Sequence, residues 1–155
     1  MKRVLFVCTG NICRSPTAEG VARVFFNQAG LDVDVDSAGI QGIHAGEAPD
    51  QRSQKAAMRR GFDLSKQRAR KIAAADFTQF DLIFAMDRGH LTQMKRICPP
   101  ELQGKLKLFR DLLPGQEGLD VPDPYYGGEA GFEHVLDLCE DGVGALMAAL
   151  RANAL

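Results

Sequence analysis

The chain has 155 residues, 45% of them hydrophobic and 25% charged, and its formal net charge at pH 7 is -1. This length and apolar content suit one sizeable core, so residues 1–155 are expected to form a single domain. The balanced charge and the pI of about 6.3 argue against a surface built to coat nucleic acid or an anionic membrane. Because no apolar run reaches the length of a secretion signal or a membrane span, a cytoplasmic location is expected.

The first predicted element is a short strand over Val4–Val7, which holds four β-forming residues without polar alternation. Such a run is typical of a strand buried on both faces of a parallel sheet. Cys8 follows at the carboxyl end of this strand, where open α/β sheets bind ligands. Gly10 and Asn11 are residue types that readily adopt positive φ, and a turn of that kind can point several backbone N–H groups at one anion.

Cys8 and Arg14 are separated by five residues, in the pattern C-x5-R. Ser15 is expected to cap a helix that starts at Pro16, so that the positive end of the helix faces the same turn. A cysteine attacks phosphorus as the thiolate, which a helix N-terminus, an arginine and hydrogen-bond donors favour. The planar fork of Arg14 would engage two phosphoryl oxygens. Residues 8–16 therefore read as a nucleophilic, phosphate-binding loop.

The next elements are predicted from the spacing of apolar residues and from the residues that begin and end helices. Apolar residues at helical spacing predict a helix from Pro16 to about Ala29, closed by Gly30. Residues 31–37 alternate with period two, as an edge strand does. A loop of small residues then runs from Ser37 to residue 49, and Asp50 caps a helix that reaches about residue 60.

The second half of the chain repeats the alternation of helices and strands. The predicted segments are short helical pieces at 66–71 and 73–77, a buried strand at 81–86, a helix from Asp87 to about Ile97, a strand at 105–109, a long loop at 110–128 and a helix at 129–151. This order favours an open, twisted, Rossmann-like parallel sheet with helices on both faces.

The four cysteines are Cys8, Cys13, Cys98 and Cys139, and they form no C-x-x-C pair and no zinc spacing with histidine. We expect reduced thiols, no metal and no cofactor. The three histidines are isolated in the sequence, and surface or capping roles are expected for them.

The segment from Cys8 to Pro16, C-T-G-N-I-C-R-S-P, resembles the signature loop of the low-molecular-weight protein tyrosine phosphatases almost residue for residue. The sequence Asp-Pro-Tyr-Tyr at 123–126 and the total length also fit that family. The resemblance implies four parallel strands in the order 2-1-3-4, phosphotyrosine proteins as substrates, and phosphate, sulfate or vanadate as ligands of the loop. It also implies a phosphocysteine intermediate on Cys8.

The resemblance also supplies a set of site residues. Those expected to bind substrate are Thr9, Gly10, Asn11, Ile12, Cys13, Ser15, Ile43, Tyr125 and Tyr126, with Ser37 as a support for the loop. In the family, the second loop cysteine can form a reversible disulfide with the nucleophile, which would make Cys8 and Cys13 a redox-sensitive pair. The chain departs from the family pattern at Ile43, where many relatives carry an aromatic residue, and at Gln67, where eukaryotic members often carry histidine.

A phosphotyrosine ester also needs a general acid, typically worth about 10²- to 10⁴-fold in rate. Asp123 is the best candidate because it lies in the long loop and is followed by Pro124, which stiffens the backbone. Asp87 is the competing acid, although helix capping explains it adequately. Repulsion from Asp120 is expected to favour protonation of Asp123. We therefore expect an activity optimum on the acidic side of neutrality.

Three other functions stay open at the level of sequence. An arsenate reductase of this fold needs two further cysteines close together, and residues 76–93 contain none. A protein arginine phosphatase of this type carries threonine at the position of Ile12 and usually lacks the tyrosine pair. A catalytically silent phosphopeptide binder would have little reason to retain Cys8, Arg14 and Asp123.

Overall fold

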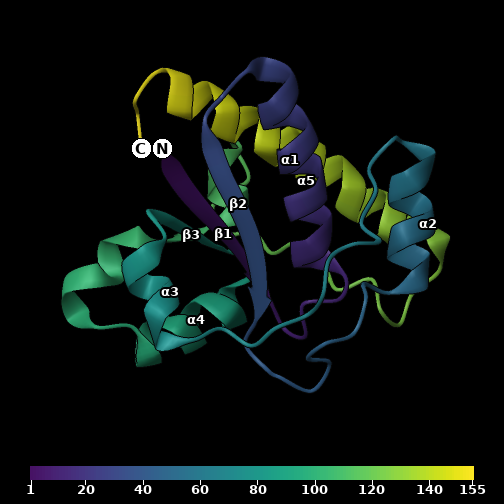
Figure 1. The fold of residues 1–155 in the computed structure, drawn as a ribbon, viewed down its shortest axis with the longest axis horizontal. Helices are drawn as coiled ribbons and strands as arrows, with labels where there is room; N and C mark the ends of the chain where they lie inside the picture. Colours follow the sequence, from purple (N-terminus) through teal and green to yellow (C-terminus); the bar gives the residue numbers. More distant parts are fainter.

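The structure, a computed structural model that describes residues 1–155, contains one four-stranded parallel sheet in the order β2-β1-β3-β4 (Figure 1). The strands are β1 (Lys2–Cys8), β2 (Val33–Gly39), β3 (Leu82–Ala85) and β4 (Leu106–Leu108). The helices are α1 (Arg14–Ala29), α2 (Gln51–Arg59), α3 (Ala74–Gln79), α4 (Arg88–Ile97) and α5 (Glu129–Arg151), with 3-10 turns at Pro100–Lys105 and Phe109–Leu112. The predicted fold class and strand order are confirmed.

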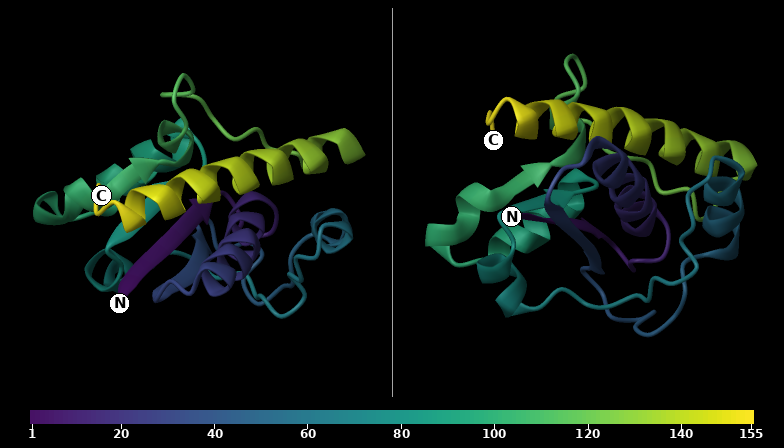
Figure 2. Two further views of the ribbon diagram at one scale, coloured as in Figure 1. Left: turned by 90° about the horizontal axis from the view of Figure 1, so that it is seen from above. Right: turned by 45° about the horizontal axis from the view of Figure 1, so that its top comes forward.

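The sheet is covered on both faces because its central strands are apolar throughout. Val4 and Phe6 of β1 face α1 and α5, whereas Leu5 and Val7 face α3 and α4. All four side chains are fully buried. Figures 1 and 2 show α1 and α5 on one side of the sheet and α3 and α4 on the other. The unbroken β-forming run of the sequence thus reflects burial on two faces.

The carboxyl ends of the strands meet at one edge of the sheet, and the long loops gather there. Cys8, at the end of β1, is in register with Gly39 at the end of β2. A Cβ at Gly39 would lie 2.9 Å from the carbonyl oxygen of Thr9 and 3.0 Å from the amide nitrogen of Asn11. Glycine at position 39 therefore lets the second strand approach the turn that follows Cys8.

Two local predictions are wrong. Residues 66–71 are not helical; they run extended beside the loop at 39–47, where Lys71 forms a parallel bridge with Gly39 and Ala69 donates its amide hydrogen to the carbonyl of Glu47. These pairings provide the backbone N–H and C=O groups with the hydrogen bonds that a helix would otherwise provide. Ser15 is not the N-cap of α1, because the helix begins at Arg14 and Cys13 occupies the cap position.

Other boundaries moved by small amounts. The second strand is Val33–Gly39 instead of 31–37, and the fourth is Leu106–Leu108 instead of 105–109, because a 3-10 turn adjoins it on either side. Helix α5 covers the predicted range 129–151. No helix in the chain combines the length and the apolarity needed to cross a membrane.

Candidate active site

The turn after β1 holds the sulfur of Cys8 at its base. Cys8 is 3% exposed, and its Sγ lies 3.0 Å from the hydroxyl oxygen of Ser15. Because α1 starts one residue before Ser15, this hydroxyl projects from the first turn of the helix toward the sulfur, and the positive end of the helix faces the same hollow. The predicted cap is thus a direct partner of the cysteine.

Asn11 fixes the shape of the turn. It adopts a φ of 59°, in the left-handed region that asparagine tolerates better than most residues. Its side-chain amide donates to the hydroxyls of Ser15, at 2.8 Å, and Ser37, at 2.9 Å, and its carbonyl oxygen accepts from the amide of Arg70 at 3.0 Å. Ser37 in turn donates to the carboxylate of Glu19 at 2.7 Å. Asn11, Ser15 and Ser37 therefore support the loop from behind.

Arg14 reaches from α1 to the ends of two other segments. Its Nη1 donates to the Asp87 carboxylate at 2.8 Å and to the carbonyl of Val121 at 3.0 Å. Its Nη2 donates to the hydroxyl oxygen of Thr9 at 3.2 Å. The Arg14 side chain is 5% exposed, so a cation is held nearly out of water. Asp87 is also the expected cap of α4, where it accepts from the amide of His90 at 2.9 Å.

The loop with Asp123 is attached to the end of β3 by its backbone. The amide of Val121 donates to the carbonyl of Met86 at 2.8 Å, while the Val121 carbonyl binds Arg14. Two residues later, the Asp123 carboxylate lies 3.7 Å from Nη2 of Arg14 and is 47% exposed. It also accepts from the amide of Tyr125 at 3.0 Å.

The charge of Asp120 is balanced locally. Its carboxylate binds Arg88 through the guanidinium, at 3.1 Å, and through the backbone amide, at 2.8 Å. The hydrogen bond from the Arg88 side chain is the main cause that lowers the pKa of Asp120. The expected repulsion between Asp120 and Asp123 is therefore countered by a neighbouring cation.

These segments enclose a cavity of about 360 Å³. The lining residues are Cys8, Thr9, Gly10, Ile12, Cys13, Arg14, Gln41, Ile43, His44, Asp123, Tyr125 and Tyr126. The two tyrosine rings pack edge to face, with centroids 5.0 Å apart, and Ile43 is 71% exposed at the rim. Gln67, the other position at which the chain departs from the family pattern, lies outside this cavity. Its side-chain amide donates to the carbonyl of Pro16 at 2.9 Å.

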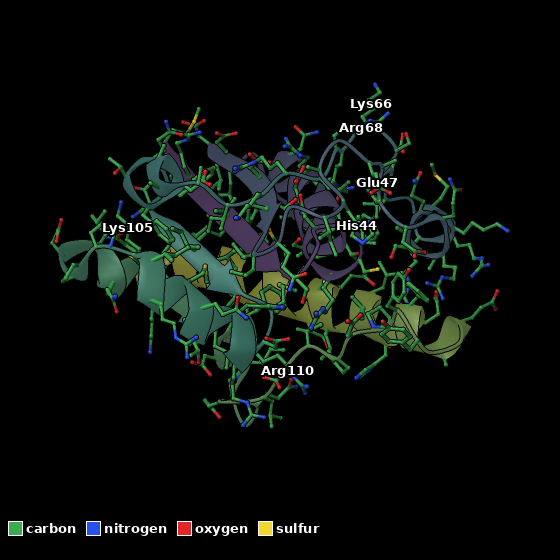
Figure 3. All side chains as sticks on the ribbon, turned by 90° about the horizontal axis from the view of Figure 1, so that it is seen from below. His44, Glu47, Lys66, Arg68, Lys105 and Arg110 are labelled. Atoms are coloured by element: carbon green, nitrogen blue, oxygen red, sulfur yellow. The ribbon has the colours of Figure 1, made fainter.

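Two histidines, for which surface or capping roles were expected, lie at the site. His44 lines the cavity and pairs through Nδ1 with Glu47 at 2.9 Å; Figure 3 shows the two residues side by side. His90 is 4% exposed, and its Nε2 lies 2.7 Å from the hydroxyl oxygen of Thr9. Burial lowers the pKa of His90 to about 4, so the ring is neutral near pH 7.

Cys13 differs from Cys8 in its surroundings. Burial, followed by the carboxylate of Asp50, raises the pKa of Cys13 to about 12. Cys13 is therefore a protonated thiol at neutral pH, beside the turn that holds Cys8. The remaining cysteines, Cys98 and Cys139, do not line the cavity.

Fold and site together define an α/β protein in which the turn after β1 brings a cysteine and an arginine to one cavity at the carboxyl edge of the sheet. The family model described as low molecular weight phosphotyrosine protein phosphatase matches residues 3–155. The chain belongs to this family.

Individual relatives agree with that assignment. The chain is 46% identical over 154 residues to a low molecular weight protein-tyrosine-phosphatase of Streptomyces coelicolor, and the match covers 96% of this chain and 93% of that protein. A crystal structure of the protein tyrosine phosphatase of Entamoeba histolytica, with Hepes in the active site, superimposes with a TM-score of 0.96 at 37% identity and covers 100% of both chains. Wzb of Vibrio vulnificus in complex with benzylphosphonate has a TM-score of 0.83 at 31% identity, covering 94% of this chain and 96% of that one.

Proposed function

We propose that the protein hydrolyses phosphotyrosine in protein substrates through a phosphocysteine intermediate on Cys8. The observation that carries the proposal is the convergence of Cys8, Arg14 and Asp123 on one cavity from two segments of the chain, the turn after β1 and the loop that holds Asp123. The benzylphosphonate bound to the Vibrio vulnificus relative, an aryl-methyl phosphonate, agrees with a ring and an anion occupying such a cavity together.

The free donors of Arg14 indicate how a phosphoryl group would bind. A guanidinium has five N–H groups, and three of them donate to Asp87, Val121 and Thr9. The Nε–H and one Nη2–H remain for a phosphoryl group. They form a fork for two phosphoryl oxygens, and the backbone amides of the turn supply donors for the others.

In the first step, the Cys8 thiolate attacks phosphorus and the bond from phosphorus to the tyrosine oxygen breaks. Asp123 donates its proton to the departing oxygen, so tyrosine leaves as a neutral phenol. In the second step, the Asp123 carboxylate takes a proton from a water molecule that attacks phosphorus. The S–P bond then breaks, and inorganic phosphate and the Cys8 thiolate are released. The same residue acts as acid and then as base.

The walls of the cavity favour an aromatic substrate. Ile43, Tyr125 and Tyr126 surround the entrance, and such side chains can pack against a flat ring. A phosphoserine stem is too short to bring its ester to a sulfur at the floor while its peptide backbone stays outside. Arsenate reduction is not favoured, because Cys139 is fully buried beside α1 and β1 and Cys98 lies at the end of α4, both away from the cavity.

Phosphate release from phosphotyrosine, phosphoserine and phosphoarginine peptides tests this proposal. We expect phosphotyrosine to be hydrolysed much faster than the other two, with inhibition by vanadate and no effect of a chelator. A Cys8→Ser variant should bind the phosphotyrosine peptide without releasing phosphate. If phosphate were released fastest from the phosphoarginine peptide, the protein would be an arginine phosphatase instead. If the unaltered protein bound phosphotyrosine peptide without releasing phosphate, it would be a phosphopeptide binder.

A further inference from the structure

The side chain of Thr9 connects the phosphate-binding loop to helix α4. Its hydroxyl oxygen lies 3.2 Å from Nη2 of Arg14 and 2.7 Å from Nε2 of His90. His90 lies in the first turn of α4 and is 4% exposed, and no step of the proposed reaction uses it. A histidine buried this deeply beside a catalytic loop calls for a physical explanation.

The direction of each hydrogen bond follows from the chemistry of the groups. A guanidinium can only donate, so the Thr9 oxygen accepts a hydrogen bond from Arg14. The single hydroxyl hydrogen of Thr9 is then free to point at His90, in the ring tautomer whose Nε2 is an acceptor. A neutral ring with an acceptor at Nε2 carries its proton on Nδ1. This nitrogen lies 3.2 Å from a carboxylate oxygen of Asp87 without forming a hydrogen bond to it, so Asp87 favours a proton on Nδ1 through its negative charge alone.

Two residues at the start of α4 thus contact the guanidinium of Arg14, one directly and one through Thr9. Asp87 holds Nη1 directly, at 2.8 Å, and His90 acts on Nη2 through the hydroxyl of Thr9. We propose that Thr9 and His90 are positioning residues for Arg14: they take up one Nη2 hydrogen, so that the other Nη2 hydrogen and the Nε hydrogen face the phosphoryl group. This inference rests on the proposed function and adds two residues to its machinery.

Because the Thr9 oxygen accepts its hydrogen bond from a charged group, the loss of this bond is expected to lower kcat/KM by about 10- to 100-fold. The guanidinium fork matches two of the three equatorial oxygens best in the transition state, so most of the loss should be in kcat and less in KM. Thr9→Val removes the hydroxyl and keeps both the shape of the side chain and the backbone amide.

The first experiment compares Thr9→Val with Thr9→Ser, which retains a hydroxyl. Thr9→Val should show the loss in kcat/KM and a weaker affinity for inorganic phosphate, and Thr9→Ser should recover most of both. Thr92→Val is the matched control, because Thr92 lies on the same helix as His90 and its hydroxyl only donates to the carbonyl of Arg88 at 3.0 Å. Unchanged phosphate affinity and kcat/KM in Thr9→Val would overturn the inference.

A second pair of variants separates positioning from packing. In an Arg14→Lys background there is no Nη2 to orient, so adding Thr9→Val should cause no further loss; a full multiplicative loss would contradict the proposal. His90→Gln, whose amide oxygen can accept from Thr9, should lose less activity than His90→Phe, which offers no acceptor.

One measurement needs no variant. Nitrogen-15 NMR of the imidazole in the unaltered protein at pH 6 should show a neutral ring protonated at Nδ1. A ring protonated at Nε2 would overturn the inference, because it could not accept from Thr9. Phosphate affinity and the tautomer both report on Arg14 even if phosphotyrosine proves not to be the substrate, so failure of the proposed function and failure of the positioning role are distinguishable.

Discussion

Asp123 gains its place in the site from its neighbours in the chain. The backbone of Val121 connects the loop to β3 on one side and to Arg14 on the other, and Asp123 follows two residues later with its carboxylate 3.7 Å from the guanidinium. The two backbone contacts of Val121 therefore set where the Asp123 carboxyl lies relative to the guanidinium.

The role of Asp123 predicts a dependence on the leaving group. Asp123→Asn should lower kcat on a phosphotyrosine peptide by about 10²- to 10⁴-fold. On an aryl phosphate with a very acidic phenol the loss should be small, because that phenolate departs without a proton. Steady-state kinetics on both substrates measure the difference. An equal loss on the two would remove Asp123 from the role of acid.

His90 predicts how stability changes with pH. Burial lowers its pKa to about 4 in the folded protein, while an unfolded histidine titrates near 6.5. Between these values the unfolded chain binds more protons, so stability should fall as pH drops from 6.5 to 4, by up to about 3 kcal/mol for this group. Urea unfolding at several pH values should show a flatter profile for His90→Gln. His134→Gln, at an exposed position, is the control, and its stability should depend on pH as that of the unaltered protein does.

At the scale of elements, α5 packs closely against the 3-10 turn that follows β4. A Cβ at Gly142 would lie 2.3 Å from the ring of Phe109, which itself packs edge to face against Phe6 and Phe84. Glycine inside a helix is ordinarily destabilising relative to alanine. In the structure, glycine at this position lets the helix approach the sheet, because any side chain would displace a fully buried ring.

Two glycines on α5 therefore predict opposite effects. Gly142→Ala should destabilise the protein by about 1–3 kcal/mol, because it overpacks the core against Phe109. Gly144 meets nothing within 4 Å, so Gly144→Ala should stabilise the helix by about 0.5–1 kcal/mol. Thermal or denaturant unfolding of the two variants tests this contrast. A similar stability for both would mean that α5 can shift away from Phe109 at little cost.

Helix α2 depends on a different kind of contact. Arg60, just after α2, binds three carboxylates of α5, those of Glu133, Asp137 and Glu140, at 3.1, 2.9 and 2.6 Å. The segment that ends in α2 also includes the loop at 39–49, which carries Ile43 and His44 into the cavity. The ionic contact between α2 and α5 thus helps to hold one wall of the site in place.

At the scale of the whole molecule, the cavity joins segments that are far apart in the chain, so a ligand should stabilise the entire fold. An anion that binds only the folded state adds about 2.7 kcal/mol at a concentration 100 times its Kd. We expect inorganic phosphate to raise the Tm of the unaltered protein in a concentration-dependent manner. Arg14→Lys lacks the fork and should show a much smaller rise. Equal shifts in both proteins would place the anion elsewhere.

The sequence determined the features that depend on residues close together in the chain. Spacing alone marked Cys8 and Arg14 as parts of one turn, and the capping residues Asp50 and Asp87 marked the starts of two helices. The left-handed Gly30 ended the first helix as expected. These predictions succeed because backbone geometry over a few residues is fixed by local sterics and local hydrogen bonds. The order of the strands and the family came from resemblance.

Tertiary structure alone decided which distant groups meet at the edge of the sheet. It brought Asp87, Val121 and, through Thr9, His90 onto Arg14, and it turned Ser15 from an expected cap into a partner of the Cys8 sulfur. These contacts follow from strand register and from the cost of burying an unpaired charge. Strand register and the burial of charge leave no pattern along the chain. Both depend on the distance between two groups in space and not on their separation in sequence.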